Sequence, residues 1–281
     1  MENIDLGMQK SIIPFKFHPR VFNSLGADLV TDDIVAIIEL VKNAYDAGAD
    51  KVIISFLKEH QKTKHDEEIT VLEIFDNGHG MDRKTIENVW FTVATPYKEN
   101  YKTVKKNTDR IITGEKGLGR LSTARLGRYL EMYTMSENEP CWKVSVDWND
   151  VSGSDPDNPI GGIIEEGEFP YSDNKSGTVL RIANLHSKWF AKKEDGEDYF
   201  KQEENKLETL ENNLSRFISP FSNIKKMGNF QIVIKNPISQ LEVQIKTPSF
   251  LDHPVYSIKG EVTENGNISY LYNYDDGDRK N

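Results

Sequence analysis

The chain is poor in the residues that hold a fold together by covalent bonds or by metal ions. It has one cysteine, Cys141, in 281 residues, which excludes an internal disulfide and a cysteine-rich metal site. Its six histidines show no HxxH or HExxH spacing, so we do not expect a zinc site. A lone cysteine is most often a small core residue, and we expect Cys141 to be buried.

Long apolar runs and an excess of positive charge are also absent. No run approaches the roughly 20 apolar residues of a membrane span, and the first ten residues, MENIDLGMQK, lack the apolar stretch of a signal peptide. We therefore expect a cytoplasmic protein. The net charge of −10 argues against a broad nucleic-acid surface. With 37% hydrophobic and 28% charged residues, the chain can bury a core in one large domain or two smaller ones.

What is present is an alternation of helical and extended patterns. Apolar residues at helical spacing cover 31–47, and Gly48 is the expected end of this helix. Two strands, in KVIISFLKE and ITVLEIFDNG, are expected to form a hairpin. The later segments are a helix in MDRKTIENVWFTVAT, strands in CWKVSVDWND and GTVLRIANL, a charged helix over 198–217, and short tail strands with a hairpin signal, ENGN, at 264–267.

The first helix carries an unusual polar stripe. Glu39, Asn43 and Asp46 follow the spacing i, i+4, i+7, which places them on one face of an α-helix. A face turned to solvent is the plain interpretation. A built site is the alternative, because an Asn offers a neutral oxygen to Mg²⁺ and a nearby Glu can accept a proton from water.

A second stretch, EIFDNGHGMD, ends a strand in a glycine-rich turn. The strand delivers Asp76 into a turn that contains Gly78 and Gly80. A DNG hairpin turn is the common explanation, but a helical pattern follows, so the turn does not close a hairpin. Glycines there allow the backbone to approach a flat or anionic ligand. We expect His79 to be exposed and not to bind a ligand.

A third stretch, GEKGLGRLSTARLG, places Gly114, Gly117 and Gly119 before the start of a helix. Backbone N–H groups at a helix N-terminus bind phosphate. The segment is neither a Walker A loop nor a GxGxxG dinucleotide fingerprint. Taken alone, it is equally compatible with a flexible connector.

In this order the motifs resemble the GHKL superfamily of ATPases, named for gyrase, the ninety-kilodalton heat-shock chaperones, histidine kinases and MutL. The resemblance covers roughly residues 15 to 190. The matching positions are Glu39, Asn43, Asp46 and Ala47 for ExxxN with a following D-A, Asp76, Gly78 and Gly80 for DxGxG, Gly114, Gly117 and Gly119 for GxxGxG, and Gly177 and Thr178 for a G-T pair that opens a strand. The implied fold is α+β, a two-layer Bergerat sandwich whose mixed, antiparallel-rich sheet is covered by helices on one face.

The resemblance also implies a role for each site residue, with ATP and Mg²⁺ as cofactors. Asp76 would accept a hydrogen bond from the adenine amino group, Thr178 would hold the bridging water or the ring, and Met81 would line the adenine. The phosphate side would use Asn43 for Mg²⁺ and Glu39 to activate the attacking water. The remaining candidates for nucleotide binding are Asp46, Gly78, Gly80, Gly114, Lys116, Gly117, Leu118 and Gly119.

Four regions follow from the same resemblance. We expect an N-terminal arm over 1–20, an ATP-binding domain over 21–197 with a basic lid at about 96–116, a connecting helix over 198–222, and the start of a β-rich second domain over 223–281 that continues beyond Asn281. A solvated loop is an equal explanation for the lid. In related ATPases a Lys or Arg of the next domain completes the site, and the sequence does not single one out here.

The expected function is a Mg²⁺-dependent, chaperone-like ATP-hydrolysing switch that dimerises with ATP and is slow in isolation. A histidine-kinase-type phosphotransferase is an alternative, but only about twenty residues precede the domain, too few for a dimerisation helix. A non-catalytic nucleotide-binding module is another, and it would lack Glu39 or Asn43, which are both present. No membrane or nucleic-acid partner is indicated.

Overall fold

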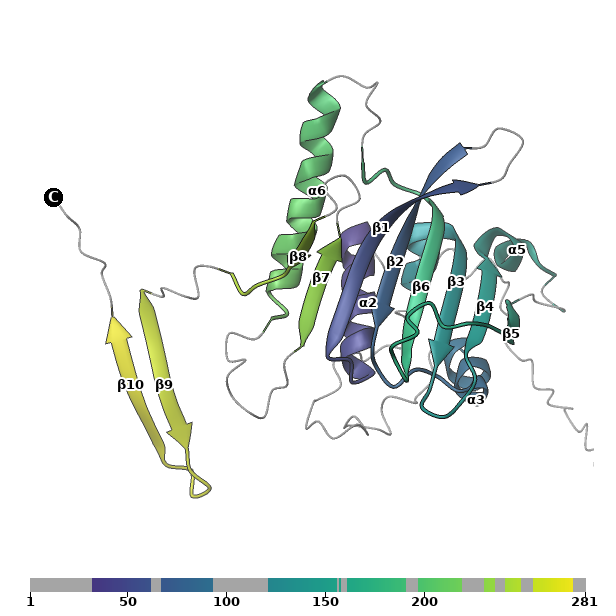
Figure 1. Cartoon of the computed structure of the whole chain (residues 1–281). Coiled ribbons are helices and arrows are strands. Elements are labelled where there is room, and N and C mark those ends of the chain that lie inside the picture. The colour runs from purple at the N-terminus through teal and green to yellow at the C-terminus, as the bar shows by residue number, and fades with distance from the viewer. Residues whose placement is uncertain are drawn as a thin grey trace, which may run out of the picture.

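The computed structural model describes residues 32–61, 67–92, 121–155, 157, 161–190, 197–218, 230–235, 241–248 and 255–274. In this part the chain forms an eight-stranded sheet with helices against it and a separate two-stranded hairpin (Figure 1). The expected lid and the glycine-rich segment up to Gly119 lie outside the described residues.

The main sheet is mixed and mostly antiparallel. Its order is β5-β4-β3-β6-β2-β1-β7-β8, and only β1 and β7 pair in parallel. The strands are β1 (Lys51–Gln61), β2 (Glu67–Asp76), β3 (Gly127–Met135), β4 (Trp142–Asp147), β5 (Ile163–Glu166), β6 (Gly177–Leu185), β7 (Gln231–Lys235) and β8 (Glu242–Gln244). The α+β class and the hairpin of the first two strands are confirmed.

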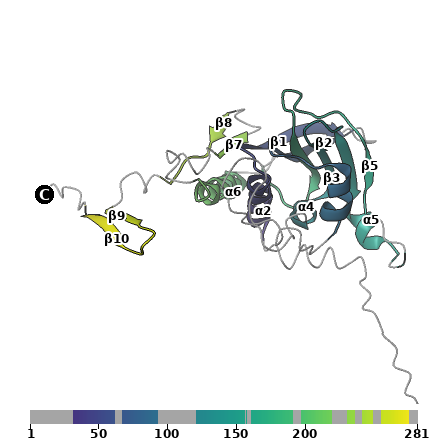
Figure 2. The ribbon, with the colours of Figure 1, turned by 90° about the horizontal axis from the view of Figure 1, so that it is seen from below.

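The described helices include two long ones and several short turns. They are α2 (Asp33–Asp46), α3 (Arg83–Thr85), the π-helical turn η1 (Ile86–Trp90), α4 (Leu121–Leu126), α5 (Trp148–Gly153) and α6 (Glu197–Ser215). Figure 2 shows α2, α4 and α6 on the same side of the sheet. No helix in this part of the chain is long and apolar enough to cross a membrane.

The main core lies between the sheet and these helices. Alternate residues of each strand face the helices, as the period of two requires. Ile54 and Leu72 of the sheet and Ile37 of α2 are fully buried there. Burying a side chain of this size contributes about 1.5–3 kcal/mol, so this layer fixes α2 on the sheet.

The charged helix α6 is part of the same core. Leu210 and Leu214 are fully buried although the helix is polar overall. Phe56 of β1 packs on Trp189 and Phe190, with ring centroids 5.0 and 5.1 Å apart, and these two residues lie between β6 and α6 in the chain. The connecting helix is therefore fixed to the helix layer and the sheet.

The opposite face of the sheet carries a smaller apolar cluster of Ile53, Phe75, Val179 and Val233. Tyr171 stacks on Phe75 with ring centroids 3.9 Å apart and donates a hydrogen bond of 2.8 Å to Oε1 of Glu73. Burial and the adjacent carboxylate raise the pKa of Tyr171 above its ordinary value, so the phenol stays protonated and keeps donating.

The β-rich tail contributes to two different sheets. β7 pairs with β1 and β8 pairs with β7, so Gln231–Lys235 and Glu242–Gln244 extend the main sheet. β9 (Tyr256–Val262) and β10 (Ile268–Tyr274) form the separate hairpin, closed by the expected ENGN turn, where Gly266 has φ +78°. How the chain divides into domains stays a prediction.

Cys141 is buried, as expected from its solitary position in the sequence. It lies just before β4, and its side chain is 7% exposed. Burial raises the pKa of the thiol, which makes this cysteine a poor nucleophile.

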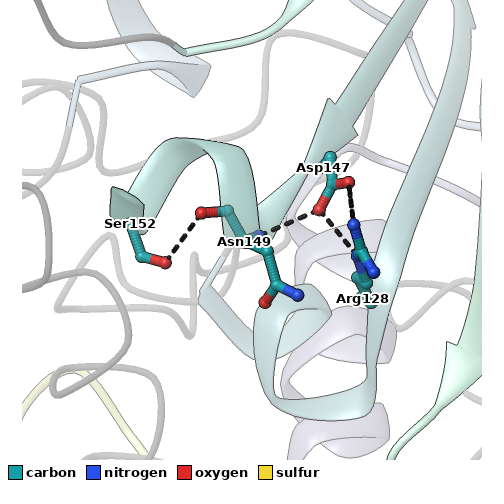
Figure 3. Close-up of polar contacts among 4 residues, drawn as sticks. All are labelled: Arg128, Asp147, Asn149 and Ser152. Atoms are coloured by element: carbon teal, nitrogen blue, oxygen red, sulfur yellow. Dashed lines mark hydrogen bonds and ion pairs between the residues drawn. The ribbon is translucent and has the colours of Figure 1, made fainter. Parts of the chain in front are cut away.

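Helix α5 was not expected, because the WND residues were assigned to the end of a strand. Asp147 causes the change of direction: its carboxylate accepts a hydrogen bond of 2.9 Å from the Asn149 amide and so caps the new helix. The same carboxylate binds Arg128 through contacts of 2.8 to 3.2 Å (Figure 3). Hydrogen bonding from Arg128 lowers the pKa of Asp147 below its ordinary value of 3.8.

Replacing Asp147 by Asn should therefore remove a pH-dependent part of the stability. Because the folded state lowers the pKa of Asp147, the carboxylate contributes stability above the unfolded pKa, and this contribution disappears as the pH falls through the folded value. We expect Asp147→Asn to lower the free energy of unfolding by about 1 kcal/mol near neutral pH, and the difference from wild type to vanish well below about pH 4.

Urea denaturation over this pH range measures both effects. The control is Asp173→Asn, which removes an exposed turn carboxylate that is neither part of α5 nor a partner of Arg128 among the described residues. A constant difference between wild type and Asp147→Asn from neutral to acid pH would contradict the assignment.

Candidate functional site

Helix α2 starts and stops at residues that fix the position of its polar stripe. Asp32 caps the first turn, since its Oδ1 accepts a hydrogen bond of 2.9 Å from the Val35 amide. At the other end Gly48 adopts φ +73°, a left-handed conformation that favours glycine and ends the helix. The predicted helix is confirmed, with its described part beginning at Asp33.

The stripe is not an ordinary solvent-exposed face. Asp46 is 9% exposed, while Glu39 and Asn43 are half-buried. Oε1 of Glu39 lies 2.7 Å from Nζ of Lys42, one helical turn along. These polar groups therefore lie at the margin of the core, where they are held in place but can be reached by a ligand.

The turn after β2 docks against the C-terminal end of α2. The His79 amide donates a hydrogen bond of 3.0 Å to the Ala47 carbonyl. A Cβ at Gly78 would lie 2.9 Å from Cβ of Ala47 and 2.8 Å from Oδ1 of Asp76, so only glycine allows the two segments to come this close. This contact joins the first and second sequence motifs, 30 residues apart in the chain.

Asp76 ends β2 inside this junction. It is 9% exposed, and its Oδ1 accepts a hydrogen bond of 2.8 Å from the Gly78 amide. Across the sheet it is paired with Thr178, the second residue of β6. Gly177 has φ +151°, and a Cβ there would lie 2.3 Å from the Asp76 carbonyl oxygen. The G-T pair thus brings the fourth motif beside the second.

Thr134 of β3 completes this group and was missed by the sequence analysis. It is fully buried, and its Oγ1 accepts a hydrogen bond of 2.9 Å from the Met81 amide. The same oxygen lies 3.2 Å from Oγ1 of Thr178 and donates to the Gly177 carbonyl at 3.3 Å. The available signal was a hydroxyl residue on the helix-facing side of β3, at alternate spacing after the apolar Leu130 and Met132.

Two further residues that the sequence analysis missed secure the DNG turn. Oδ1 of Asn77 accepts hydrogen bonds of 2.9 Å from the amides of Asp50 and Lys51, which fixes the start of β1 to the end of β2. Oγ of Ser176 donates a hydrogen bond of 2.8 Å to the Gly78 carbonyl. Each lies next to a motif residue in the sequence, and this position was the only sequence signal that it supports the site.

The other residues of the second motif behave as their sequence predicts. Gly80 has φ +63°, and a Cβ there would lie 2.0 Å from the Met135 carbonyl, so β3 leaves no room for a side chain. Met81 follows and packs, partly buried, against the core. His79 is exposed, as expected, with its Nδ1 2.6 Å from the Gly80 carbonyl.

The third motif is not described, but the helix that follows it is. Gly114, Lys116, Gly117, Leu118 and Gly119 lie outside the described residues. α4 begins at Leu121 and packs against α2.

A buried carboxylate links α2, α4 and α6. Asp33, 5% exposed, accepts a hydrogen bond of 2.8 Å from Nζ of Lys206 on α6, and that ammonium lies 4.2 Å from the ring centre of Trp189. Nε of Arg125 on α4 lies 3.6 Å from Oδ1 of Asp33. These contacts span 173 positions along the chain, so no local pattern could have revealed them.

The oxygen atoms of Asn43 and Glu39 fit a metal ion that is bound jointly by the protein and by phosphate groups. Within the described residues no group of three His, Cys, Asp or Glu side chains is placed to hold a metal ion. Asn43 offers one amide oxygen close to the Glu39 carboxylate on the same helical face. Mg²⁺ is commonly bound by one or two protein oxygens together with phosphates and water, so these residues fit a nucleotide-bound Mg²⁺.

A groove of about 390 Å³ lies away from this site. Its lining includes Glu131 and Arg181, together with Asp147 and Asp150, and contains no residue of α2. Glu131 and Arg181 share their sheet face with Tyr133 and Val179, which pack on the apolar cluster opposite the helices. The groove is therefore separate from the junction of α2 with Asp76.

Comparison with known proteins agrees with this geometry. No curated protein matches the chain. The model of a family described as histidine kinase-, DNA gyrase B-, and HSP90-like ATPase matches residues 32–178, just over half of the chain. The matched range runs from the cap of α2 to the G-T pair and includes Asp76 and the glycine-rich segment. The chain therefore belongs to the family of histidine kinase-, DNA gyrase B- and HSP90-like ATPases.

Proposed function

We propose that this ATP-binding domain hydrolyses ATP with Mg²⁺ and uses the cycle as a conformational switch of chaperone-like type. One observation carries the proposal: the turn of Asp76 docks on the end of α2, so the two motifs occupy one site. The proposed reaction needs ATP, which the cytoplasm supplies, so we place the protein there. We also infer that the full-length protein forms an ATP-dependent homodimer.

Asp76 is the proposed adenine-binding residue. Its carboxylate is held by the Gly78 amide at 2.8 Å and is nearly buried, so it can accept a hydrogen bond from an exocyclic amine in a dry environment. Guanine has a carbonyl at the corresponding ring position and would face the carboxylate with a second acceptor. Donor–acceptor matching therefore favours adenine.

The threonine pair next to Asp76 supports this assignment. The hydroxyl of Thr134 is filled by its protein partners and would orient Thr178, whose hydroxyl lies 3.2 Å away beside the end of β2 and would bind a water that bridges to the purine. Met81, fixed to Thr134 through its amide, supplies an apolar contact for the ring. Gly80 allows the turn after β2 to lie close to Met135 of β3.

The phosphates would lie along the stripe of α2. Asn43 would hold Mg²⁺, and Gly114, Lys116, Gly117, Leu118 and Gly119 would contact the phosphate oxygens. Bound Mg²⁺ would neutralise charge on the phosphates as the terminal group leaves. Asp46, nearly buried at the end of the stripe, would support the polar network around the nucleotide.

Glu39 is the proposed general base. Its side chain is 35% exposed and its Oε1 lies 2.7 Å from Nζ of Lys42, so water can reach the side chain while its orientation is restricted. It would accept a proton from the water that attacks the terminal phosphorus, and ADP would leave with the electron pair of the broken bond.

The contacts of Asp33 support the switch. α4 follows the glycine-rich segment, α2 carries Glu39 and Asn43, and α6 leads to the tail. Oδ1 of Asp33 and Nε of Arg125 are buried, 3.6 Å apart, and each lacks a hydrogen-bond partner among the residues that the structure describes. A small shift of α4 would complete this bond and change how tightly α2 and α6 are held together.

The adenine assignment is tested by Asp76→Asn. The amide places an N–H donor where the adenine amine needs an acceptor, so ATP and ADP affinity should fall at least about tenfold, or 1.4 kcal/mol. Isothermal titration calorimetry measures this loss, with Asp173→Asn, an exposed turn residue, as the matched control. Undiminished ADP affinity in Asp76→Asn would defeat the assignment.

The role of Glu39 is tested by Glu39→Gln, which keeps the shape of the side chain. Loss of the base should reduce kcat by about 100-fold or more while ATP binding stays near its wild-type value. Steady-state phosphate release and calorimetry measure the two quantities, and Glu208→Gln, an exposed residue of α6, is the control. Wild-type turnover in Glu39→Gln would favour a non-catalytic nucleotide-binding module.

The switch is tested at Lys206, which the proposal does not place in contact with nucleotide. In wild type, ATP should slow hydrogen exchange of the amides in α6. Lys206→Met breaks the bond to Asp33, and this ATP-dependent change should disappear, whereas Lys206→Arg should retain it. An equal ATP-dependent change in Lys206→Met and wild type would show that α6 is not coupled to the nucleotide through Asp33.

A further inference from the structure

The end of α6 contacts the helix that carries the proposed general base. Nζ of Lys42 lies 5.6 Å from the ring centre of Phe217, which follows closely after Ser215, the last residue of α6. The same nitrogen donates a hydrogen bond of 2.7 Å to Oε1 of Glu39. A continuous series of contacts therefore leads from the end of α6 through Lys42 to Glu39.

Phe217 is held in place although its side chain is 41% exposed. Its amide donates a hydrogen bond of 2.9 Å to the Leu214 carbonyl. Leu214 is fully buried, and Ile218, on the other side of Phe217, packs against the same core. The backbone on both sides of Phe217 is anchored, so the ring is presented to α2 by a fixed segment.

Two separate contacts join α2 and α6. Lys206 of α6 donates to Asp33 in the first turn of α2, and Phe217 meets Lys42 further along α2. Residue numbers increase in the same direction on both helices, so α2 and α6 run parallel, side by side (Figure 2). Because the contacts lie on different turns, α6 cannot slide along α2 without changing at least one of them.

The chain after α6 also holds this region of α2. The ring of Tyr45, one turn after Lys42, lies edge-on to that of Phe230 with centroids 5.3 Å apart. Phe230 directly precedes β7, which pairs with β1. Phe217 and Phe230 lie outside the matched range 32–178, whereas Lys42 lies within it. These aromatic contacts therefore connect the catalytic helix with the part of the chain that follows the ATP-binding domain.

The contact with Phe217 matters because the ion pair of Lys42 with Glu39 is weak by itself. The two side chains are 29% and 35% exposed, and a pair of this kind restricts two flexible side chains only slightly. An aromatic ring within about 6 Å of an ammonium group attracts it, so Phe217 confines Lys42. Lys42 then confines Oε1 of Glu39, while no described residue donates a hydrogen bond to Oε2.

We propose that Lys42 and Phe217 are positioning residues for Glu39, so that the end of α6 sets the rate of hydrolysis. This role rests on the proposed function, in which Glu39 is the general base. The ammonium holds Oε1, and Oε2 accepts the proton of the attacking water. The water oxygen bonds to the terminal phosphorus, and ADP leaves with the electron pair of the broken bond. Movement of Phe217 away from Lys42 would slow this step without changing ATP affinity.

The first test is steady-state phosphate release by the full chain, which separates kcat from KM. Phe217→Leu keeps an apolar side chain but removes the ring, so kcat should fall roughly two- to fivefold, the range that such a contact implies, with KM unchanged. Phe217→Tyr keeps the ring and should retain most of the wild-type kcat. Arg216→Leu, at the exposed neighbouring position, is the control and should behave like wild type.

A double variant distinguishes positioning from a general loss of stability. Lys42→Met should lower kcat at least as much as Phe217→Leu. Adding Phe217→Leu to Lys42→Met should lower it no further, because the ring then has no ammonium to hold. Calorimetry should show nearly wild-type ATP affinity in every variant. Independent effects of the two substitutions on kcat, or a loss of ATP affinity in Lys42→Met that places its ammonium on the phosphates, would overturn the proposal.

The Glu39→Gln variant separates this proposal from the ATPase proposal. Wild-type kcat in Phe217→Leu, together with the expected loss of turnover in Glu39→Gln, would overturn the positioning role and leave the ATPase function standing. A wild-type chain that binds ATP but releases no phosphate would overturn both.

Discussion

The site depends on the close contact between the turn after β2 and the C-terminal end of α2. It rests on one backbone hydrogen bond, from the His79 amide to the Ala47 carbonyl, and on the missing side chain of Gly78. A methyl group at Gly78 would meet Ala47 and Asp76 at 2.9 Å or less. Because this contact sets the end of α2 against the end of β2, it determines where the polar stripe lies relative to Asp76, and every proposed role in nucleotide binding follows from that arrangement.

Local patterns predicted the elements that local forces determine. The helix over 33–46, the hairpin of the first two strands, the strand over 177–185 and the charged helix were all visible as periodicity. Asp147 shows where this approach failed: the strand pattern was read through WND, although the carboxylate ends the strand and caps a helix that the sequence analysis did not expect. A side chain that serves both as an ion-pair partner and as a cap has no periodic signature.

The motif residues could be listed from the sequence, but their supporting contacts could not. Thr134 joins the site only because β3 pairs with β6 and turns its hydroxyl towards Thr178. Asp33, the first residue of α2, is a buried contact between three helices, because its partners Lys206 and Arg125 come from α6 and α4. The sequence analysis similarly predicted one β-rich region for the tail. In the structure β7 pairs with β1 and β8 pairs with β7, so both belong to the main sheet, whereas β9 and β10 form a separate ribbon.

The central claim is that the junction of α2 with the Asp76 turn is an adenine-nucleotide site. A crystal structure grown with Mg²⁺ and a non-hydrolysable ATP analogue tests it most directly. We expect the adenine amine within hydrogen-bond distance of the Asp76 carboxylate, with the metal at Asn43 and the terminal phosphate near Glu39. A nucleotide bound elsewhere, such as in the groove beside Arg181, with Asp76 and Glu39 facing only solvent, would contradict it.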